Sequence, residues 1–206
     1  MIAKNKKHQD DANFEFVPEF LNLAYSHIQK YPKSRQQSAV MPLLDLAQRQ
    51  NDGWLSQSAI EYVAKLLEMA PVRVLEVATF YTMYNLKPVG KFHIQVCTNL
   101  PCWLRGATDV VKACKKTLEI NVNETTNDNL FTLSEVECLG ACVNAPMMQI
   151  NDDFYEDLTE QSANDVLCKL RQGQKVNSGS QIGRHTCEPS NGLTSLKHQA
   201  KKVSQG

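Results

Sequence analysis

The sequence predicts an α/β protein in which a helical bundle precedes a small α/β domain. Up to about residue 86, apolar residues recur three and four positions apart, the spacing of amphipathic helices. After residue 87 the pattern changes to short alternating segments interleaved with two helical ones. At 206 residues the chain can bury a sizeable core. We expect a loose N-terminus at 1–15, a helical bundle at 16–86, the α/β domain at 87–173 and an extended tail at 174–206.

Three helices are predicted at the start of the bundle. The first begins near Pro18, which suits a first helical turn, and ends before Pro32. The second carries Pro42 in its own first turn, where a missing N–H does no harm. The third opens with a capping box formed by Ser58 and Glu61.

The segment 72–84 is ambiguous between strand and helix. Its β-branched residues suit a strand, whereas its length favours a helix. We expect its aromatic residues Phe80, Tyr81 and Tyr84 to pack in the core of the bundle rather than to form an electron path.

The α/β domain is predicted to begin with a strand at 92–97, where residue types alternate. Pro101 can open a helix that runs to about Leu118. We further expect an extended piece at 130–136, a hairpin at 147–155 and a last helix at 160–171.

Composition narrows the class of protein. Lys and Arg number 22 and so do Asp and Glu, which gives no basic bias toward nucleic acid. No apolar run approaches the roughly 18 residues of a membrane-spanning helix, so we expect no direct membrane insertion. The first residues lack an apolar stretch and include Asp10 and Asp11, unlike a secretory signal or a transit peptide. The default compartment is the cytoplasm, where seven cysteines favour metal ligation or catalysis over disulfides.

Two closely spaced cysteine pairs form the candidate site. Cys97 and Cys102 have four residues between them, and Cys138 and Cys142 have three. Four thiolates from two short loops match the ligand set of a 2Fe–2S cluster. The predicted elements place Cys97 at a strand end and Cys102 in a first helical turn, whose free N–H groups favour an anionic cluster.

The cysteine spacing alone leaves other kinds of site open. A structural zinc site with four cysteine ligands accepts the same spacings. Neither pair is C-x-x-C, which disfavours a dithiol enzyme, and a Rieske site would need two histidines, whereas only His93 is near and is expected on the strand surface. Cys114 and Cys168 fall in predicted helices as small apolar fillers, and Cys187 is the one rival ligand.

The residues around the two pairs resemble a known family. Cys138–Pro146, preceded by Asp128–Thr132, is similar to the signature of the 2Fe–2S subunit of NADH:quinone oxidoreductase, the respiratory complex I of bacteria and mitochondria. Cys97–Gly106 resembles the first ligand pair of that family, although Asn99 and Leu100 are bulkier than the small residues common there. The resemblance extends over about residues 14–196, including Ser38–Leu44, Gly53–Leu55, Val77–Tyr81 and Cys187–Ser195.

The resemblance implies a thioredoxin-like ferredoxin domain with one 2Fe–2S cluster on Cys97, Cys102, Cys138 and Cys142, and it favours the cluster over zinc. It also implies a partner, the flavoprotein subunit that binds FMN and NADH, together with other subunits of the peripheral arm of complex I. The chain would then exchange single electrons with FMN, on the inner face of the cell membrane. The sequence has no G-x-G-x-x-G motif and no P-loop of its own. A related alternative is the diaphorase subunit of an NAD-linked hydrogenase or formate dehydrogenase.

The same resemblance suggests roles for neighbouring residues. Thr98, Gly140 and Ala141 would shape the surroundings of the cluster, and Arg105 would face solvent or a partner. The tail around residues 184–195 is too polar to fold alone and would lie along the flavoprotein partner, ordering on contact. Pro101, Trp103 and Leu104 would fix the helix start and pack it.

Overall fold

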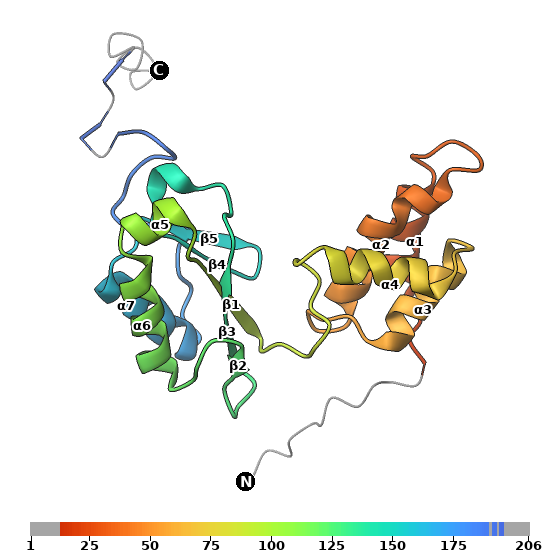
Figure 1. Ribbon diagram of the computed structural model, residues 1–206, viewed down its shortest axis with the longest axis horizontal. Coiled ribbons are helices and arrows are strands. Elements are labelled where there is room, and N and C mark those ends of the chain that lie inside the picture. The colour runs from red at the N-terminus through yellow and green to blue at the C-terminus, as the bar shows by residue number, and fades with distance from the viewer. Residues whose placement is uncertain (1–12, 190, 193, 196–206) are drawn as a thin grey trace. The chain divides into compact units, whose positions relative to one another are not determined.

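A computed structural model describes residues 13–189, 191, 192, 194 and 195 (Figure 1). The N-terminal segment 1–12 and the tail residues 190, 193 and 196–206 lie outside the described residues, and so do the predictions that fall on them. The chain divides into two compact units, 1–89 and 90–206. This division lies three residues after the 86/87 boundary suggested by the sequence.

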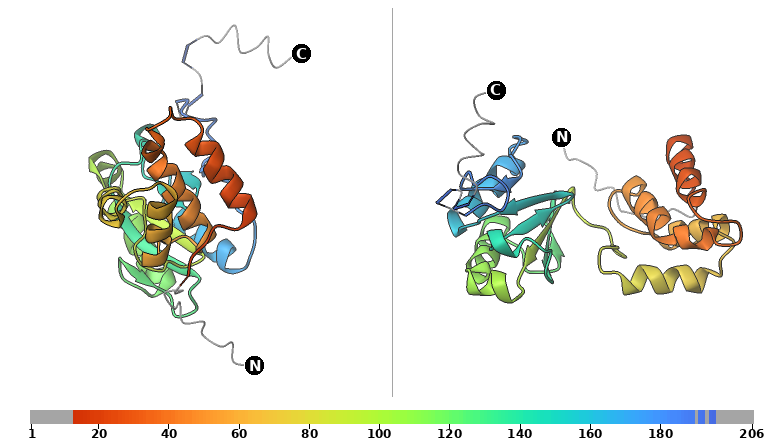
Figure 2. Two further views of the ribbon diagram at one scale, coloured as in Figure 1. Left: turned by 90° about the vertical axis from the view of Figure 1, so that its right-hand side faces the viewer. Right: turned by 90° about the horizontal axis from the view of Figure 1, so that it is seen from above.

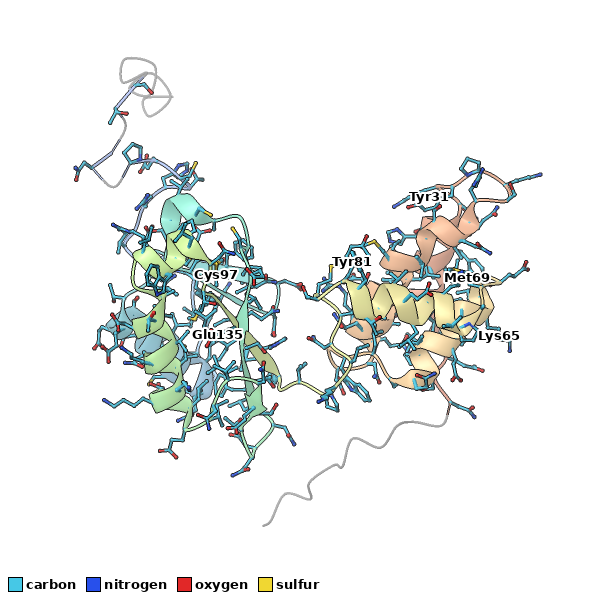
Figure 3. All side chains as sticks on the ribbon, viewed as in Figure 1. Tyr31, Lys65, Met69, Tyr81, Cys97 and Glu135 are labelled. Carbon is cyan, nitrogen blue, oxygen red and sulfur yellow. The ribbon has the colours of Figure 1, made fainter. Side chains whose placement is uncertain are left out.

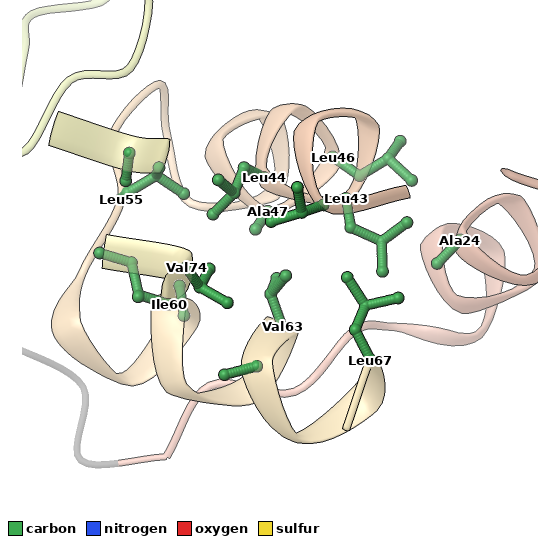
Figure 4. Packing of buried hydrophobic residues seen from close by; sticks show 14 of the residues in the cluster. Ala24, Leu43, Leu44, Leu46, Ala47, Leu55, Ile60, Val63, Leu67 and Val74 are labelled. Carbon is green, nitrogen blue, oxygen red and sulfur yellow. The ribbon is translucent and has the colours of Figure 1, made fainter. Parts of the chain in front are cut away.

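The first unit is helical, as Figure 2 also shows. Its core is formed by apolar side chains from neighbouring helices, with Leu43, Leu44 and Val63 pointing toward one another in Figure 4. Burial of such a face is what stabilises short helices, because helices of 10 or 11 residues are marginal alone. The elements are α1 (Pro18–Ile28), a 3-10 helix (Gln36–Ala39), α2 (Val40–Gln50), α3 (Gln57–Leu66) and α4 (Pro71–Phe80).

The ambiguous segment 72–84 forms a helix over most of its length, because α4 starts at Pro71 and ends at Phe80. The packing expected of its aromatic residues holds for Tyr84 alone. Tyr84 is buried and its hydroxyl donates to the carbonyl of Met41 at 2.9 Å. Phe80 is 77% exposed and Tyr81 is also exposed, because both lie at or beyond the last turn of α4, past its buried face.

The predicted capping box at the start of α3 is wrong. The N-cap residue is Ser56, whose hydroxyl accepts a hydrogen bond from the N–H of Ala59 at 3.2 Å. Ser58 lies inside the helix, and the Glu61 carboxylate accepts instead from the side chain of Gln57. Ser56 takes the role because its extended backbone places the hydroxyl over the first turn.

The second unit is a six-stranded sheet with strand order β2-β3-β1-β4-β5-β6. Helices α6 and α7 pack against each other and cover the sheet from the same side in Figure 1. Both contribute apolar side chains to one core with the strands. The elements are β1 (Phe92–Cys97), α5 (Leu100–Leu104), α6 (Ala107–Leu118), β2 (Glu124–Thr125), β3 (Phe131–Val136), a 3-10 helix (Cys142–Asn144), β4 (Met148–Ile150), β5 (Asp153–Glu156), α7 (Glu160–Arg171) and β6 (Gly179–Ser180).

The single helix predicted from Pro101 to Leu118 is interrupted. Gly106, with φ of +102°, separates the short α5 from α6. A left-handed backbone conformation ends one helix and redirects the chain, and glycine adopts it without steric cost. The short helix α5 can therefore lie at the sheet edge while α6 runs back along the sheet face (Figure 1).

The first part of the tail belongs to the second unit. Gly179 and Ser180 form β6, which pairs in parallel with Tyr155 and Glu156 of β5. The extended tail expected from residue 174 is thus held against the sheet over these residues. Within the described part of the chain, no helix is long and apolar enough to cross a bilayer.

Candidate metal centre

The sheet topology brings the two cysteine loops to one edge. Strand β1 ends at Cys97, and its parallel neighbour β3 ends at Val136, which is the register partner of Cys97. Parallel strands end at the same edge of a sheet, so the loop that follows β3 starts beside the loop that follows β1. Cys138 lies two residues beyond Val136, and the N–H of Thr98 donates to the Val136 carbonyl at 3.2 Å.

Cys97 and Cys102 form the inner pair of the site. They are 2% and 1% exposed, and Cys97 is labelled at the end of β1 in Figure 3. Burial raises the pKa of Cys102 to about 12, with a further contribution from its hydrogen bond to the Cys97 thiol. The backbone of Met147 holds both cysteines, because its carbonyl accepts from the Cys97 N–H at 3.3 Å and its N–H donates to the Cys102 sulfur.

Cys138 and Cys142 form the outer pair, and both are exposed. Their Sγ atoms lie 3.3 Å apart and share a hydrogen bond. The N–H of Gly140, whose φ is +88°, lowers the pKa of Cys138, and the Cys142 thiol adds to this effect. The same shared bond raises the pKa of Cys142. The two shifts are opposite because one proton serves both sulfurs, so Cys138 is the easier of the two to ionise.

The two pairs lie near enough to affect each other's pKa values. The pKa values of Cys102 and Cys142 are each raised by the charge of a thiolate from the other pair. Within the described part of the chain, no three His, Cys, Asp or Glu side chains surround one position that would suit a single metal ion. A two-iron cluster sets a different requirement, namely two thiolates for each iron, and two thiol pairs fit that requirement. Ala107, Ala145 and Met147 pack around the inner pair and keep water from it.

The short helix α5 presents apolar side chains to solvent beside the inner pair. Pro101 lies in its first turn, as predicted. Trp103 and Leu104 were expected to pack the helix, but they are 58% and 68% exposed. The single turn of α5 turns Cys102 inward, and so the two residues that follow it face outward. Arg105 is exposed as well, as expected.

Three predictions about other residues have mixed outcomes. Cys114 is buried in α6 as an apolar filler, and burial raises its pKa to about 12. Cys168 was expected to be a filler too, but it is exposed because it lies on the outer face of α7. His93 was expected on the strand surface but is buried, because β1 lies inside the sheet between β3 and β4, whose side chains flank it. Its Nε2 lies 2.9 Å from the hydroxyl of Ser134 on β3.

Sequence reasoning missed the polar contacts that join the two loops to the rest of the unit. The side-chain amide of Asn99 donates to the carboxylate of Glu137 at 2.6 Å, which ties the first cysteine loop to the residue before Cys138. Arg184 forms an ion pair with Asp157, at 2.7 Å, next to the second loop. Charged and amide residues of this kind look like ordinary surface residues in a sequence. Cys187, the rival ligand, lines a shallow hollow together with residues of the second loop.

Comparison with known proteins places the chain in a family. Residues 24–171 match the protein family described as thioredoxin-like [2Fe-2S] ferredoxin. The chain is 61% identical, over 77% of its length and 95% of the relative, to the E subunit of NADH-quinone oxidoreductase from Rickettsia conorii. It is 49% identical, over 94% of its length and 78% of the relative, to the mitochondrial NADH dehydrogenase [ubiquinone] flavoprotein 2 of Dictyostelium discoideum.

A solved structure shares the fold at much lower identity. An NAD+-reducing [NiFe]-hydrogenase in the air-oxidised state matches 63% of this chain and 23% of its own chain, with a TM-score of 0.56 and 18% identity. That likeness shows the fold alone. The family match confirms the predicted thioredoxin-like α/β fold and one 2Fe–2S cluster as the cofactor. The chain belongs to the thioredoxin-like [2Fe-2S] ferredoxin family and, within it, to the E subunits of NADH-quinone oxidoreductase.

Proposed function

We propose that Cys97, Cys102, Cys138 and Cys142 hold the 2Fe–2S cluster and that the chain is an electron-transfer subunit of NADH:quinone oxidoreductase. The observation that carries this proposal is that the two loops bearing the thiol pairs meet at one sheet edge, where β1 and β3 end side by side and Asn99 bonds to Glu137. A 2Fe–2S cluster takes up and releases one electron at a time. The chain's own part is to hold the cluster and to set its surroundings.

The two pairs divide this task. The buried inner pair would hold the cluster next to apolar side chains, whereas the outer pair would hold it from an exposed loop. Backbone N–H groups supplied by Met147 and Gly140 stabilise negative charge on the sulfurs. This arrangement would shield the inner pair from water and leave the outer pair accessible to an electron donor.

The proposed donor is the FMN of a flavoprotein subunit that also binds NADH. Exposed apolar side chains lie within two residues of the proposed ligands: Leu100, Trp103 and Leu104 on α5 near Cys102, and Val143 next to Cys142. Exposed apolar side chains that include an aromatic residue are typical of a protein interface. We propose that the flavoprotein subunit covers them, bringing the flavin close to the cluster.

The respiratory assignment is preferred over the hydrogenase or formate dehydrogenase alternative. It is supported by 61% identity to a subunit of NADH-quinone oxidoreductase, against 18% identity to the NAD+-reducing hydrogenase chain. With other subunits of the peripheral arm, the chain would lie on the inner face of the cell membrane. Purification of the native assembly tests this point, since the proposal requires quinone reduction in a membrane fraction. A complex that contains hydrogenase or formate dehydrogenase subunits would contradict it.

Metal analysis of the full-length chain tests the cofactor site. We expect about two iron atoms and about two acid-labile sulfide ions per chain, and no stoichiometric zinc. Cys138→Ala should lose both iron and sulfide, whereas the exposed Cys168→Ala, the matched control, should keep them. Zinc without sulfide in the wild-type chain, or full sulfide in Cys138→Ala, would overturn the assignment.

A further inference from the structure

The tail of the second unit returns to the loop that carries Cys142. Strand β6 holds the chain beside β5, and Arg184 follows four residues after Ser180. The Arg184 guanidinium donates to the Asp157 carboxylate at 2.7 Å, and the two side chains are only 10% and 4% exposed. Ser180 completes the contact. Its hydroxyl donates to the other carboxylate oxygen of Asp157 at 2.7 Å and accepts from the backbone N–H of Arg184 at 3.2 Å.

Asn144 connects this ion pair to the ligand loop. It ends the 3-10 helix Cys142–Asn144, two residues after the proposed ligand. Its side-chain oxygen accepts from Arg184 at 3.1 Å, and its backbone carbonyl accepts from the N–H of Asp157 at 2.7 Å. Its side-chain amide donates to the Glu156 carboxylate at 2.6 Å and to the carbonyl of Thr186 at 2.8 Å. Asn144 is itself buried, so these bonds lie inside the protein.

We propose that Asn144, Asp157, Ser180 and Arg184, here called the Arg184 network, are positioning residues for the cluster, which fix the loop that presents Cys142. The inference rests on Cys142 being a ligand. A buried ion pair adds little net stability compared with apolar residues of the same size, but breaking it leaves a buried charge without a partner. The network therefore fixes one arrangement of the loop more than it stabilises the fold.

The geometry also separates two parts of the tail. Up to Thr186 the chain bonds to the second unit, through Arg184 and through the Thr186 carbonyl. The tail around residues 184–195 was expected to become ordered on contact with a partner. Its first residues do not need a partner for this, because they already bond to the second unit. The network would orient the outer cysteine pair in the subunit before any partner binds.

The test compares cluster retention in full-length variants. Arg184→Gln keeps hydrogen-bonding capacity but removes the charge, and Arg184→Lys restores the charge with fewer donors. Ser178→Ala is the matched control, because Ser178 is exposed on the same segment. We expect Arg184→Gln to lose its cluster to EDTA roughly tenfold faster than wild type or more, with a changed electron paramagnetic resonance spectrum after dithionite. Arg184→Lys should recover part of the retention, and Ser178→Ala should match wild type.

Unchanged retention and an unchanged spectrum in Arg184→Gln would overturn the inference. If Arg184→Gln does not yield folded protein, as judged by far-ultraviolet circular dichroism, Ser180→Ala decides the question. That milder variant must lose its cluster faster than Ser178→Ala, and equal loss would overturn the inference. Cys142→Ala keeps the two proposals apart: a cluster that survives this change refutes the ligand assignment, whereas loss of the cluster there with no effect of Arg184→Gln refutes the network alone.

Discussion

At the scale of single residues, the cysteines differ mainly in burial. The proposed inner ligands are buried against Met147, and the proposed outer ligands are exposed on their loop. If these cysteines hold the cluster, burial would make release of the inner pair costly, and exposure of the outer pair would keep the cluster within reach of a partner. The remaining thiols lie outside this division, and among them Cys114 is buried whereas Cys168 is exposed.

Cys114→Ala and Cys168→Ala should both leave the cluster spectrum intact, but only the first should destabilise the protein. Cys114 is fully buried in α6, so removal of its sulfur leaves a small void that costs about 1–2 kcal/mol. Cys168 is exposed, and its removal should change the free energy of unfolding by about 0.5 kcal/mol or less. Urea denaturation and the visible spectrum measure the two effects. Loss of the spectrum in Cys114→Ala would point to a fifth functional thiol.

His93 should make the second unit sensitive to acid. Burial lowers the pKa of His93 from 6.5 to about 4, so the unfolded chain binds a proton at a pH where the folded chain does not. The contribution of neutral His93 to the free energy of unfolding is therefore fully present above about pH 7, and it is lost as the pH falls from 6.5 toward 4. Between pH 7 and pH 5 the loss is about 2 kcal/mol.

His93→Gln should remove this acid sensitivity while keeping a polar partner for Ser134. The chain has two tryptophans, so a Trp54→Phe background leaves Trp103 as the single reporter of the second unit. Urea denaturation followed by its fluorescence at pH 7 and pH 5 measures the difference. Equal losses of stability with and without His93 would show that this histidine is not the source of the acid sensitivity.

At the scale of elements, periodicity predicted where helices and strands lie but missed how some helices begin and end and how the strands pair. The predicted last helix, 160–171, is α7 itself, and the strand at 92–97 is β1. The break at Gly106 and the cap at Ser56 were missed, because a single glycine is tolerated in a helical pattern and two serines compete for one cap. The parallel pairing of β1 with β3 links residues far apart in the chain, and residue types within either strand do not encode their partner.

Of the candidate site, the cysteines were predictable but their surroundings were not. The type and spacing of the four cysteines marked them as the proposed ligands. The Arg184–Asp157 pair could not be found this way, because only the fold buries these two charges together. Trp103 was expected to pack for its apolar character, yet the outward face of α5 exposes it.

Gly90 lies just before β1, the strand that ends at Cys97, and its backbone passes close to β3. A Cβ atom at this position would lie 2.8 Å from the backbone N and C of Phe131 in β3. Gly90→Ala should therefore push β3 away from the start of β1 and lower the free energy of unfolding by about 1–3 kcal/mol. The exposed neighbour Lys91→Ala is the control, with an expected change of about 0.5 kcal/mol or less. Identical melting temperatures of the two variants would show that β3 can move away from residue 90 without loss of stability, which would contradict this prediction.

At the scale of the whole molecule, the exposed apolar residues beside the proposed ligands should matter for assembly with a partner and not for folding. Trp103→Ser combined with Leu104→Ser removes side chains that contribute little to the core, so stability should change by about 1 kcal/mol or less. Binding to the flavoprotein subunit should weaken tenfold or more, in line with the loss of an aromatic contact at an interface. Isothermal titration calorimetry with the purified flavoprotein subunit measures this. Leu23→Ser, an exposed apolar residue of α1, is the matched control, and equal affinities in the two variants would contradict the proposed interface.

Electron paramagnetic resonance of the dithionite-reduced full-length chain decides whether these four cysteines hold the cluster. We expect the signal of one reduced 2Fe–2S cluster in the wild-type chain and in Cys168→Ala. We expect no such signal when Cys97, Cys102, Cys138 or Cys142 is changed to Ala. A full-strength, unaltered signal in any of these four variants would show that the changed cysteine is not a ligand.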